Sequence, residues 1–522
     1  MAQEYHSPVP GQIPIIAYAP IPQSLQNKIG KGSNRVTQVR QIISKVKECG
    51  FNTILFGGDF EQIRYILYAV DVAPYKIPVI ALATYLTATP YSSVNAINTI
   101  LIKDIIYNTE NLKGWNIWDE PWYPMWGNAT FGISDESESK SFTLEDWNRL
   151  SIGYKICSEL TPDKLIYWNL AFPKTHETKF LGNCVNYEQY LDILQELYKP
   201  ALWSYDVYPI IQERATSEIE AEQWHFYRAL RIFSNHAKKT QSRFWAFAMC
   251  AEHAKYKNNT EWYDRRPLPT IGELRFEIFS ALACGAQGIF YYRFGAGEML
   301  PSTPFDNSNK PLYFTAAPCT CQVLENPSYP DTIKFNIEFN EPLISNITTV
   351  NKEINTYKDV FLDAVPGVIY HAGQSYSNNS NSKSEDVNKK EKEIIEDGIK
   401  VVTELAPYFA IKICDSNGNF LSDSEIKNFK NSGVLMTTLI NKDKKYAMIV
   451  SHDPFRSQQI YLKFHDPIFR LTTPANYSEN PVQLSDIKPN LNYLPKGSLA
   501  ISGYYLLNPG GYLIIDVSAK KI

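Results

Sequence analysis

The 522-residue sequence has no excess of positive charge, because 51 Lys and Arg residues stand against 55 Asp and Glu, a formal net charge of −4. A surface that binds nucleic acid needs a local excess of basic side chains to neutralise phosphates, and the composition gives no sign of one. We therefore expect no nucleic acid among the partners of this chain.

Long apolar runs are also missing. No stretch is long enough to cross a bilayer, so we expect no transmembrane segment. The chain opens with Met1-Ala2-Gln3-Glu4-Tyr5, which lacks the charged and apolar regions of a secretory leader. A trimmed chain given a new Met would look the same, and this start does not argue against export.

Aromatic residues are abundant, with 34 Tyr, 26 Phe and 10 Trp making up 13% of the chain. Sugar-binding clefts favour such rings, because their apolar faces stack on sugar C–H faces while Tyr and Trp add a polar group. A large core uses the same residues, and we expect most of them to lie there.

From about residue 14 to 365, short β-branched and aromatic runs alternate with amphipathic helical stretches. This alternation predicts βαβ units around a parallel sheet, and eight strands is the number of the (β/α)8 barrel. The predicted strands are Ile15–Ala19, Thr53–Gly57, Val79–Ala83, Trp115–Trp118, Leu165–Leu170, Trp203–Tyr208, Phe244–Cys250 and Gly288–Phe294. The predicted helices are Val36–Glu48, Phe60–Ala69, Val94–Ile106, Leu144–Leu160, Tyr187–Leu197, Ile219–Ala237, Ile271–Ala283 and about Lys352–Asp363.

After Pro366 the pattern changes to strands alone, which predicts a small antiparallel β-sandwich. Its expected strands are Gly367–His371, Phe409–Ile413, Val434–Leu439, Tyr446–Ser451, Gln459–Phe464, Ala500–Leu506 and Tyr512–Val517. Residues 374–395, rich in Ser, Asn, Lys and Glu, predict a mobile loop. The fold class is thus α/β, with a (β/α)8 catalytic barrel at 1–365 and a C-terminal β-sandwich domain at 366–522.

Motifs for metals and phosphates are scarce. The eight cysteines form no CxxC pair, and those inside predicted barrel elements are expected to be buried free thiols. A metallohydrolase barrel gathers several His and carboxylate ligands at strand ends, but only His253 closely follows a predicted strand. A phosphate-binding turn is suggested only by Gly295-Ala296-Gly297. We expect neither a metal nor another cofactor.

Predicted strand four ends with two adjacent carboxylates, Asp119 and Glu120, followed by Pro121. Active sites of (β/α)8 barrels lie at the C-terminal ends of the strands, so this pair is the first catalytic candidate. Strict alternation predicts that Trp118 and Glu120 share one face and that Asp119 lies on the other. If Glu120 points into the barrel mouth, Asp119 is expected to orient a loop or an Arg. Two solvated loop acids are the alternative.

Predicted strand seven has one bulky face and one small face. We expect the bulky face to pack against the helices, so that the small residues point inward and the continuation of their face reaches Glu252. Glu120 and Glu252 would then converge across the barrel mouth. The alternative is that Glu252 lies in the loop and pairs with Lys255. The bulky residues are Trp245, Phe247 and Met249.

Other strand ends supply candidate substrate-binding residues. Asp206, at the end of strand six, is expected to bind a sugar hydroxyl, to tune Glu120, or to be the second catalytic carboxylate itself. Tyr and Arg side chains beside a carboxylate nucleophile hold it ionised and in place, and loop aromatics offer stacking platforms, although each could equally serve packing. The candidates are Trp118, Asp119, Trp122, Trp126, Trp168, Asn169, Asp206, Tyr208, Trp245, Tyr291, Tyr292 and Arg293.

The segment Trp118-Asp119-Glu120-Pro121 resembles the retaining (β/α)8 glycoside hydrolases of clan A, and so do residues 204–209 and 285–292. The sequence looks like the secreted β-galactosidase-like and endo-β-glucanase-like barrels of polysaccharide-degrading bacteria, over about residues 14–365 and in outline beyond. The resemblance implies that Glu120 is the acid/base and Glu252 the nucleophile. One departure is Asp119, where the clan usually has an Asn that recognises the sugar 2-hydroxyl.

The resemblance further implies hydrolysis of a β-linked polysaccharide or oligosaccharide, with a β-glucan or β-galactoside favoured. In the retaining mechanism, Glu120 protonates the leaving oxygen, Glu252 attacks the anomeric carbon, and water resolves the glycosyl-enzyme. The protein is expected to be secreted, periplasmic or located at the cell surface. An inactive carbohydrate-binding barrel is the alternative function. No feature of the sequence sets the sugar, the linkage, endo or exo action, or the oligomeric state.

Overall fold

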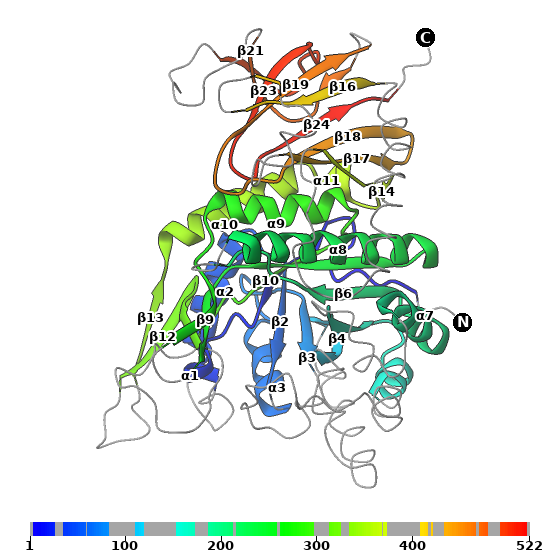
Figure 1. Ribbon diagram of the computed structural model, residues 1–522. Helices are drawn as coiled ribbons and strands as arrows, with labels where there is room; N and C mark the ends of the chain where they lie inside the picture. The colour runs from blue at the N-terminus through cyan, green and yellow to red at the C-terminus, as the bar shows by residue number, and fades with distance from the viewer. Residues whose placement is uncertain are drawn as a thin grey trace. The chain divides into compact units, whose positions relative to one another are not determined.

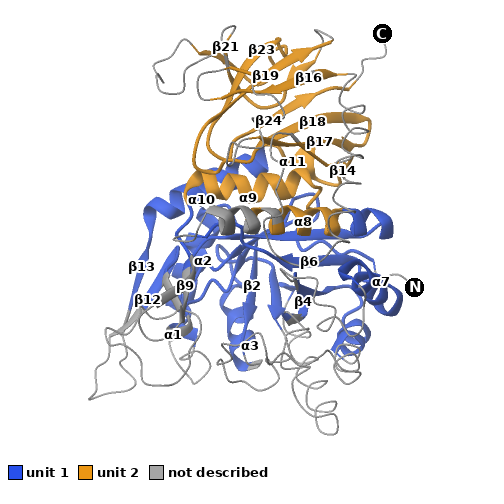
Figure 2. Cartoon of the chain, viewed as in Figure 1, with its two compact units in different colours: residues 1–213, 235–269, 288–356 blue, residues 214–234, 270–287, 357–522 orange. Residues whose placement is uncertain are grey.

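The structure is a computed structural model in which the chain forms two compact units (Figure 2). Unit 1 consists of residues 1–213, 235–269 and 288–356, and unit 2 of residues 214–234, 270–287 and 357–522. The described residues are 4–26, 35–58, 60–82, 110–119, 153–172, 186–211, 216–257, 261–296, 313–324, 334–367, 369–372, 408–415, 419–420, 433–465, 469–478 and 491–518. The loop predicted at 374–395 and the helix predicted at 94–106 lie outside them.

Unit 1 is built on a closed barrel of eight parallel strands (Figure 1), so the predicted (β/α)8 fold is confirmed. All eight barrel strands overlap the predicted ones. Around the barrel the order is β1-β10-β7-β6-β5-β4-β3-β2. The strands are β1 Ile15–Tyr18, β2 Thr53–Gly57, β3 Val79–Leu82, β4 Leu112–Asp119, β5 Leu165–Ala171, β6 Leu202–Asp206, β7 Arg243–Met249 and β10 Ile289–Tyr292.

Large apolar and aromatic side chains fill the barrel interior. Phe247 stacks on Phe290 at 4.4 Å between ring centroids, and Trp245 meets Tyr167 at 5.8 Å. The cluster comprises Ile16, Tyr18, Leu55, Ile80, Leu165, Tyr167, Leu202, Trp245, Phe247 and Phe290. The predicted orientation of strand seven was therefore wrong. Its bulky face points inward, because this barrel is filled by aromatic rings rather than lined by small residues.

Helices of unit 1 follow the predicted amphipathic pattern. Helix α2 (Val36–Glu48) buries residues spaced three and four apart, and α3 (Phe60–Ala69) and α7 (Tyr187–Tyr198) match their predictions closely. The helix predicted at 144–160 is described only from residue 153, where it is helical. The buried residues of α2 are Val39, Ile42, Ile43 and Val46.

The helix expected at 352–363 begins earlier than predicted. Helix α10 spans Glu341–Thr356, and the short α11 (Lys358–Phe361) follows it. The side chain of Asn340 accepts a hydrogen bond from the backbone N–H of Leu343 at 3.2 Å and so caps the start of α10. This cap sets the true beginning of the helix.

Two small sheets follow barrel strands β7 and β10. The first has the order β11-β8-β9 and is built from β8 (Glu252–Lys257), β9 (Glu261–Arg266) and β11 (Tyr313–Ala316). The second is the antiparallel pair of β12 (Cys319–Leu324) and β13 (Lys334–Phe339).

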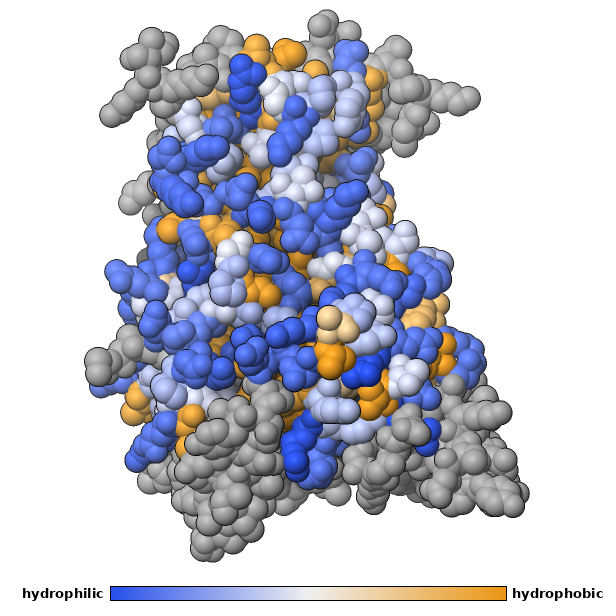
Figure 3. All heavy atoms as spheres, turned by 180° about the vertical axis from the view of Figure 1, so that it is seen from behind, coloured by the Kyte–Doolittle hydropathy of each residue, from blue (hydrophilic) through white to orange (hydrophobic). Residues whose placement is uncertain are grey.

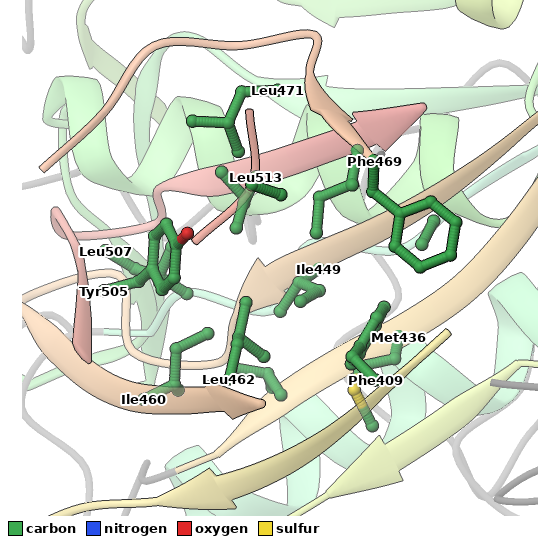
Figure 4. Packing of buried hydrophobic residues seen from close by; sticks show 14 of the residues in the cluster. Phe409, Met436, Ile449, Ile460, Leu462, Phe469, Leu471, Tyr505, Leu507 and Leu513 are labelled. Atoms are coloured by element: carbon green, nitrogen blue, oxygen red, sulfur yellow. The ribbon is translucent and has the colours of Figure 1, made fainter. Parts of the chain in front are cut away.

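Unit 2 contains an antiparallel β-sandwich, as predicted. One sheet has the order β14-β17-β18-β24-β20, with β15 paired to β17, and the other has the order β16-β19-β23-β21-β22. Apolar side chains from both sheets meet between them (Figure 4). The strands are β14 Val365–Pro366, β15 Tyr370–Ala372, β16 Phe409–Ile413, β17 Val434–Asn441, β18 Lys444–Ser451, β19 Gln458–Phe464, β20 Arg470–Leu471, β21 Ala475–Ser478, β22 Asn492–Leu494, β23 Gly503–Leu507 and β24 Tyr512–Asp516.

Helix α9 (Ile271–Ala283) and residues 216–234 of helix α8 (Thr216–Thr240) also belong to unit 2. Thr270 and Glu273 form a reciprocal capping box at the start of α9. The ring of Phe279 stacks on Tyr512 of β24 with centroids 3.6 Å apart, and α9 is therefore packed on the sandwich within this unit.

On the face drawn in Figure 3, hydrophilic residues predominate among those described. Figure 3 shows one face of the molecule, where hydrophobic residues occur in small separate groups among hydrophilic ones. Over the described ranges, no helix has the length and apolar character needed to cross a membrane.

Candidate active site

The candidate active site lies at the C-terminal ends of barrel strands β1, β4, β5 and β6, where a hydrogen-bond network joins their last residues. Asp119 accepts a hydrogen bond from the hydroxyl of Tyr18 on Oδ2 and one from Nδ2 of Asn169 on Oδ1, both at 2.8 Å. The same Nδ2 donates to Oδ1 of Asp206 at 3.2 Å, and Oδ1 of Asn169 accepts from the Ser204 hydroxyl at 3.0 Å. Two carboxylates are thus joined through one amide.

Asp119 points into the barrel, and the predicted orientation of this residue was wrong. Strand β4 has a register shift between Asn116 and Trp118 against β5, where one residue is inserted in the ladder. The insertion reverses the alternation beyond it, so that Asp119 pairs in register with the inward-facing Asn169. Because β1 and β4 are not neighbours in the barrel, the bond from Tyr18 to Asp119 crosses the mouth.

Burial raises the pKa of both carboxyl groups. Burial raises the pKa of Asp119, while the hydrogen bonds from Asn169 and Tyr18 stabilise its ionised form and oppose that rise. The pKa of Asp206 is raised to about 7, first by burial and then by the negative charge of Asp119. Near neutral pH, Asp206 therefore gains and loses a proton, while two hydrogen bonds stabilise the ionised form of Asp119.

Three tyrosines surround the carboxylates. The ring of Tyr18 lies 5.1 Å from that of Tyr292 at the end of β10, and Tyr292 stacks on Tyr208 at 5.5 Å between centroids. Burial raises the pKa of Tyr18 and Tyr208 well above the usual value, and the nearby carboxylates add to the rise. The Tyr18 and Tyr208 phenols are therefore neutral at physiological pH.

Two guanidinium groups partly offset the negative charge. Arg266, at the end of β9, donates a hydrogen bond to the backbone carbonyl of Tyr208, and its charge lowers the pKa of Asp206. Arg293, which follows β10, lowers the pKa of Tyr18 through its charge. The arrangement can hold a proton near neutrality, keep a neighbouring carboxylate ionised and present aromatic faces to a ligand.

Of the predicted substrate-binding residues, Asp119, Asn169, Asp206, Tyr208 and Tyr292 come together in this network, and Arg293 acts on it electrostatically. The sequence analysis did not identify three residues of this network, although the strand positions of two of them could have indicated it. These are Tyr18, which closes a strand; Ser204, two residues before Asp206 on the same face; and Arg266, which the unpredicted β8–β9 hairpin supplies.

Three predicted substrate-binding residues lie elsewhere. Trp168 is 1% exposed and stacks on Tyr154 on the outer, helix-facing side of β5. Tyr291 faces outward too, where its hydroxyl donates to Asn351 at 2.6 Å. Trp245 is fully buried in the barrel interior. Trp168 and Tyr291 were misplaced because a strand end predicts position along the barrel but not which face a side chain occupies. Trp245 faces inward but lies near the start of β7, away from the mouth.

Glu120, Trp122 and Trp126 lie outside the described residues, as does the side chain of Trp118. Glu252 is partly buried and begins β8, where it pairs in register with Ala316 of β11. The inward alternation that led from strand seven to Glu252 does not hold, and its assignment as nucleophile rests on the clan A resemblance. Among the described residues, no three His, Cys, Asp or Glu side chains gather into a metal-binding group.

The sequence matches no protein-family model, and no curated protein is similar to it in sequence. Among solved structures, the chain is similar to a family 51 α-L-arabinofuranosidase from Bifidobacterium longum (7% identity, TM-score 0.44, covering 98% of this chain and 96% of that one). It is also similar to an endo-β-1,4-mannanase from Thermotoga petrophila (10% identity, TM-score 0.38, covering 87% of this chain and 94% of that one). It is similar as well to a thermostable mutant of a xylanase from Cellvibrio japonicus (10% identity, TM-score 0.32, covering 54% of this chain and 87% of that one).

Proposed function

We propose that this chain is a glycoside hydrolase that cleaves a β-linked polysaccharide or oligosaccharide, with a β-glucan or β-galactoside favoured. The observation that carries the proposal is the position of Asp119 in the barrel mouth, held by Tyr18 and Asn169. Asp119 belongs to the segment Trp118-Asp119-Glu120-Pro121, which resembles clan A enzymes. In those enzymes the acid/base residue lies at the end of strand four. In this chain the end of strand four carries Asp119, which is linked to a second carboxyl group, that of Asp206.

The proposed mechanism uses two carboxyl groups and retains the anomeric configuration. Glu120 protonates the leaving oxygen and later activates water, while Glu252 attacks the anomeric carbon. Asp206 is the alternative second carboxylate, because it lies in the network and its pKa of about 7 suits proton exchange. An inverting pair is spaced more widely, by roughly 6.5–9.5 Å, than a retaining pair at about 5 Å.

The rings around the carboxylates support a sugar substrate. Tyr18, Tyr208 and Tyr292 combine apolar ring faces with hydroxyl groups, and a sugar presents C–H faces and hydroxyls that match both features. Because a polysaccharide substrate is found outside the cell, we also propose that the enzyme is secreted, periplasmic or at the cell surface.

The test is product release from a panel of β-glucans, galactans, xylans and aryl β-glycosides. Wild type would be compared with Glu120→Gln, Glu252→Gln and Asp206→Asn, and with Asp192→Asn as a control at an exposed residue outside the network. We expect activity to be lost in Glu120→Gln and in the variant that removes the true second carboxylate. NMR of the first product formed would show whether its anomeric configuration is retained.

Binding of glycans without release of product, unchanged in Glu120→Gln, would overturn the proposal. That result would favour a carbohydrate-binding barrel without hydrolytic activity.

A further inference from the structure

The orientation of the Asn169 amide is set by its surroundings. Its Oδ1 accepts a hydrogen bond from Ser204, and its Nδ2 faces oxygens of both Asp119 and Asp206. A flipped amide would place Oδ1 against two carboxyl groups, where it would meet repulsion. Asn169 therefore donates hydrogen bonds from Nδ2 to two acidic side chains.

The two acids differ in how well their charge is stabilised. Asp119 receives one hydrogen bond on each oxygen, both at 2.8 Å. Asp206 receives only the longer 3.2 Å bond from the shared amide, besides a backbone hydrogen bond. Two carboxyl groups that contact the same amide nitrogen, with the charge of one acting on the other, favour a single proton between them, and that proton belongs on the acid with fewer donors, Asp206.

The proton on Asp206 has one suitable oxygen. Oδ1 already accepts from Asn169, so the proton resides on Oδ2. Among the described residues, the side-chain hydrogen bond to Asp206 falls on Oδ1, and the residue is partly exposed. The O–H of Asp206 is thus directed at whatever occupies the mouth beside Tyr208 and Tyr292.

We propose that Asp119, Asn169 and Asp206 form one proton-sharing unit, in which Asp119 is the ionised positioning residue and Asp206 donates a hydrogen bond from its carboxylic acid to an oxygen of the bound sugar. The substrate contact rests on the proposed function, whereas the sharing of the proton does not. The charged and titratable groups around Asp206 are Asp119 on β4, Tyr18 on β1, Tyr208 after β6, Tyr292 and Arg293 at the end of β10, and Arg266 on β9. Glu120 lies outside the described residues.

Sharing of the proton can be measured without a substrate. Infrared difference spectra of the full chain, recorded against pH, would report the C=O band of a protonated carboxylic acid. We expect a band that disappears near pH 7 in wild type and is missing in Asp206→Asn. In Asp119→Asn, where the neighbouring charge is gone, its midpoint should fall by about one pH unit. The exposed Asp192→Asn serves as the matched control.

Contact with the sugar is measured on the aryl β-glycoside that wild type hydrolyses best. We expect kcat/KM to fall as pH rises through the infrared midpoint, because Asp206 then loses its donor. Asp206→Asn keeps an N–H donor and should lose this pH dependence, while Asp206→Ala should lower kcat/KM about tenfold, mainly by raising KM. In Asp119→Asn, the pH at which kcat/KM falls should decrease together with the infrared midpoint.

An infrared band that persists in Asp206→Asn, or a midpoint unmoved in Asp119→Asn, would overturn the proton-sharing unit. A pH limb that remains in Asp206→Asn would overturn the substrate contact. If the spectra behave as expected but no glycoside is hydrolysed, the unit stands and the proposed function fails.

Discussion

The hydroxyl of Tyr18 at the end of β1 donates a 2.8 Å hydrogen bond to Asp119 at the end of β4, across the mouth of the barrel. This bond ties together two strands that are not neighbours and holds a buried carboxylate in a defined position. Much of the chemistry proposed for the site depends on it.

Tyr18→Phe should therefore impair the site more than the fold. A hydrogen bond to a charged group contributes about 1.5–3 kcal/mol, so we expect kcat/KM to fall by at least about tenfold. The pKa of Asp119 should rise, because one donor to its ionised form is lost. Steady-state kinetics on an aryl β-glycoside would measure the effect.

The control for Tyr18→Phe is Tyr291→Phe, which removes a buried hydroxyl bonded to Asn351 on the outer side of the barrel. It should lower the melting temperature but leave the kinetics near wild type. Equal kinetic losses in both variants would show that Tyr18 acts through general stability.

Asp206 is expected to make the folded protein less stable as pH rises. Its pKa is about 7 in the folded chain against a usual value of 3.8, so between these values the folded state binds more protons than the unfolded state. Stability is then highest at the acid end of this window and falls toward pH 7. Asp206→Asn should raise the free energy of unfolding at pH 8 by up to about 4 kcal/mol. Urea unfolding at a series of pH values, with Asp192→Asn alongside, would detect it, and an unchanged pH slope would contradict the prediction.

The buried pair His371 and His452 should make unit 2 sensitive to acid. The Nδ1 of His371 lies 3.0 Å from the Nε2 of His452, and Tyr227 packs against both rings. Burial lowers the pKa of His371 to about 3 and that of His452 well below its usual value. Below about pH 6.5 the unfolded state binds more protons, so stability should fall as pH decreases.

His452→Asn should weaken that acid-dependent loss, whereas His465→Asn, at an exposed position of the same sandwich, should leave it unchanged. Urea unfolding followed by circular dichroism at neutral and mildly acidic pH would compare the variants. An identical loss in wild type and His452→Asn would rule out the pair as its source.

Gly510 is predicted to be intolerant of any side chain. Its φ is +59°, and a Cβ there would collide with the backbone carbonyl of Gly272 on α9. Gly510→Ala should cost more than about 2 kcal/mol of stability. Gly497→Ala separates the two causes, since φ is +89° but nothing lies within 4 Å of the added Cβ, so only the strain of about 1 kcal/mol remains. Thermal unfolding of the two variants should therefore differ clearly.

The sequence predicted the barrel well because hydrophobic runs and helical periodicity are local signals. Eight strands and helices such as α2 appear where the pattern places them. Strands β8 and β9 were not predicted, because their segments lack a continuous apolar pattern and form a small sheet with β11. The start of α10 was missed, because Asn340 sets it through a cap that periodicity does not contain.

The site was predicted in part for a similar reason. Asn169 and Asp206 follow from the rule that strand ends carry the chemistry. The orientation of Asp119 does not, because the register shift in β4 exists only in the pairing with β5. The aromatic filling of the barrel likewise arises between strands, and it reversed the predicted faces of β7.

Residues 214–234 and 270–287 belong to the same compact unit as the sandwich, although both are inserted between strands of the barrel. The compact unit that holds the sandwich is therefore not one continuous C-terminal segment. A recombination event that swapped residues 366–522 for a foreign domain would leave α9 with a face shaped for Tyr512 and the backbone around Gly510. Evolution of this chain is expected to conserve the two inserted segments and the sandwich together.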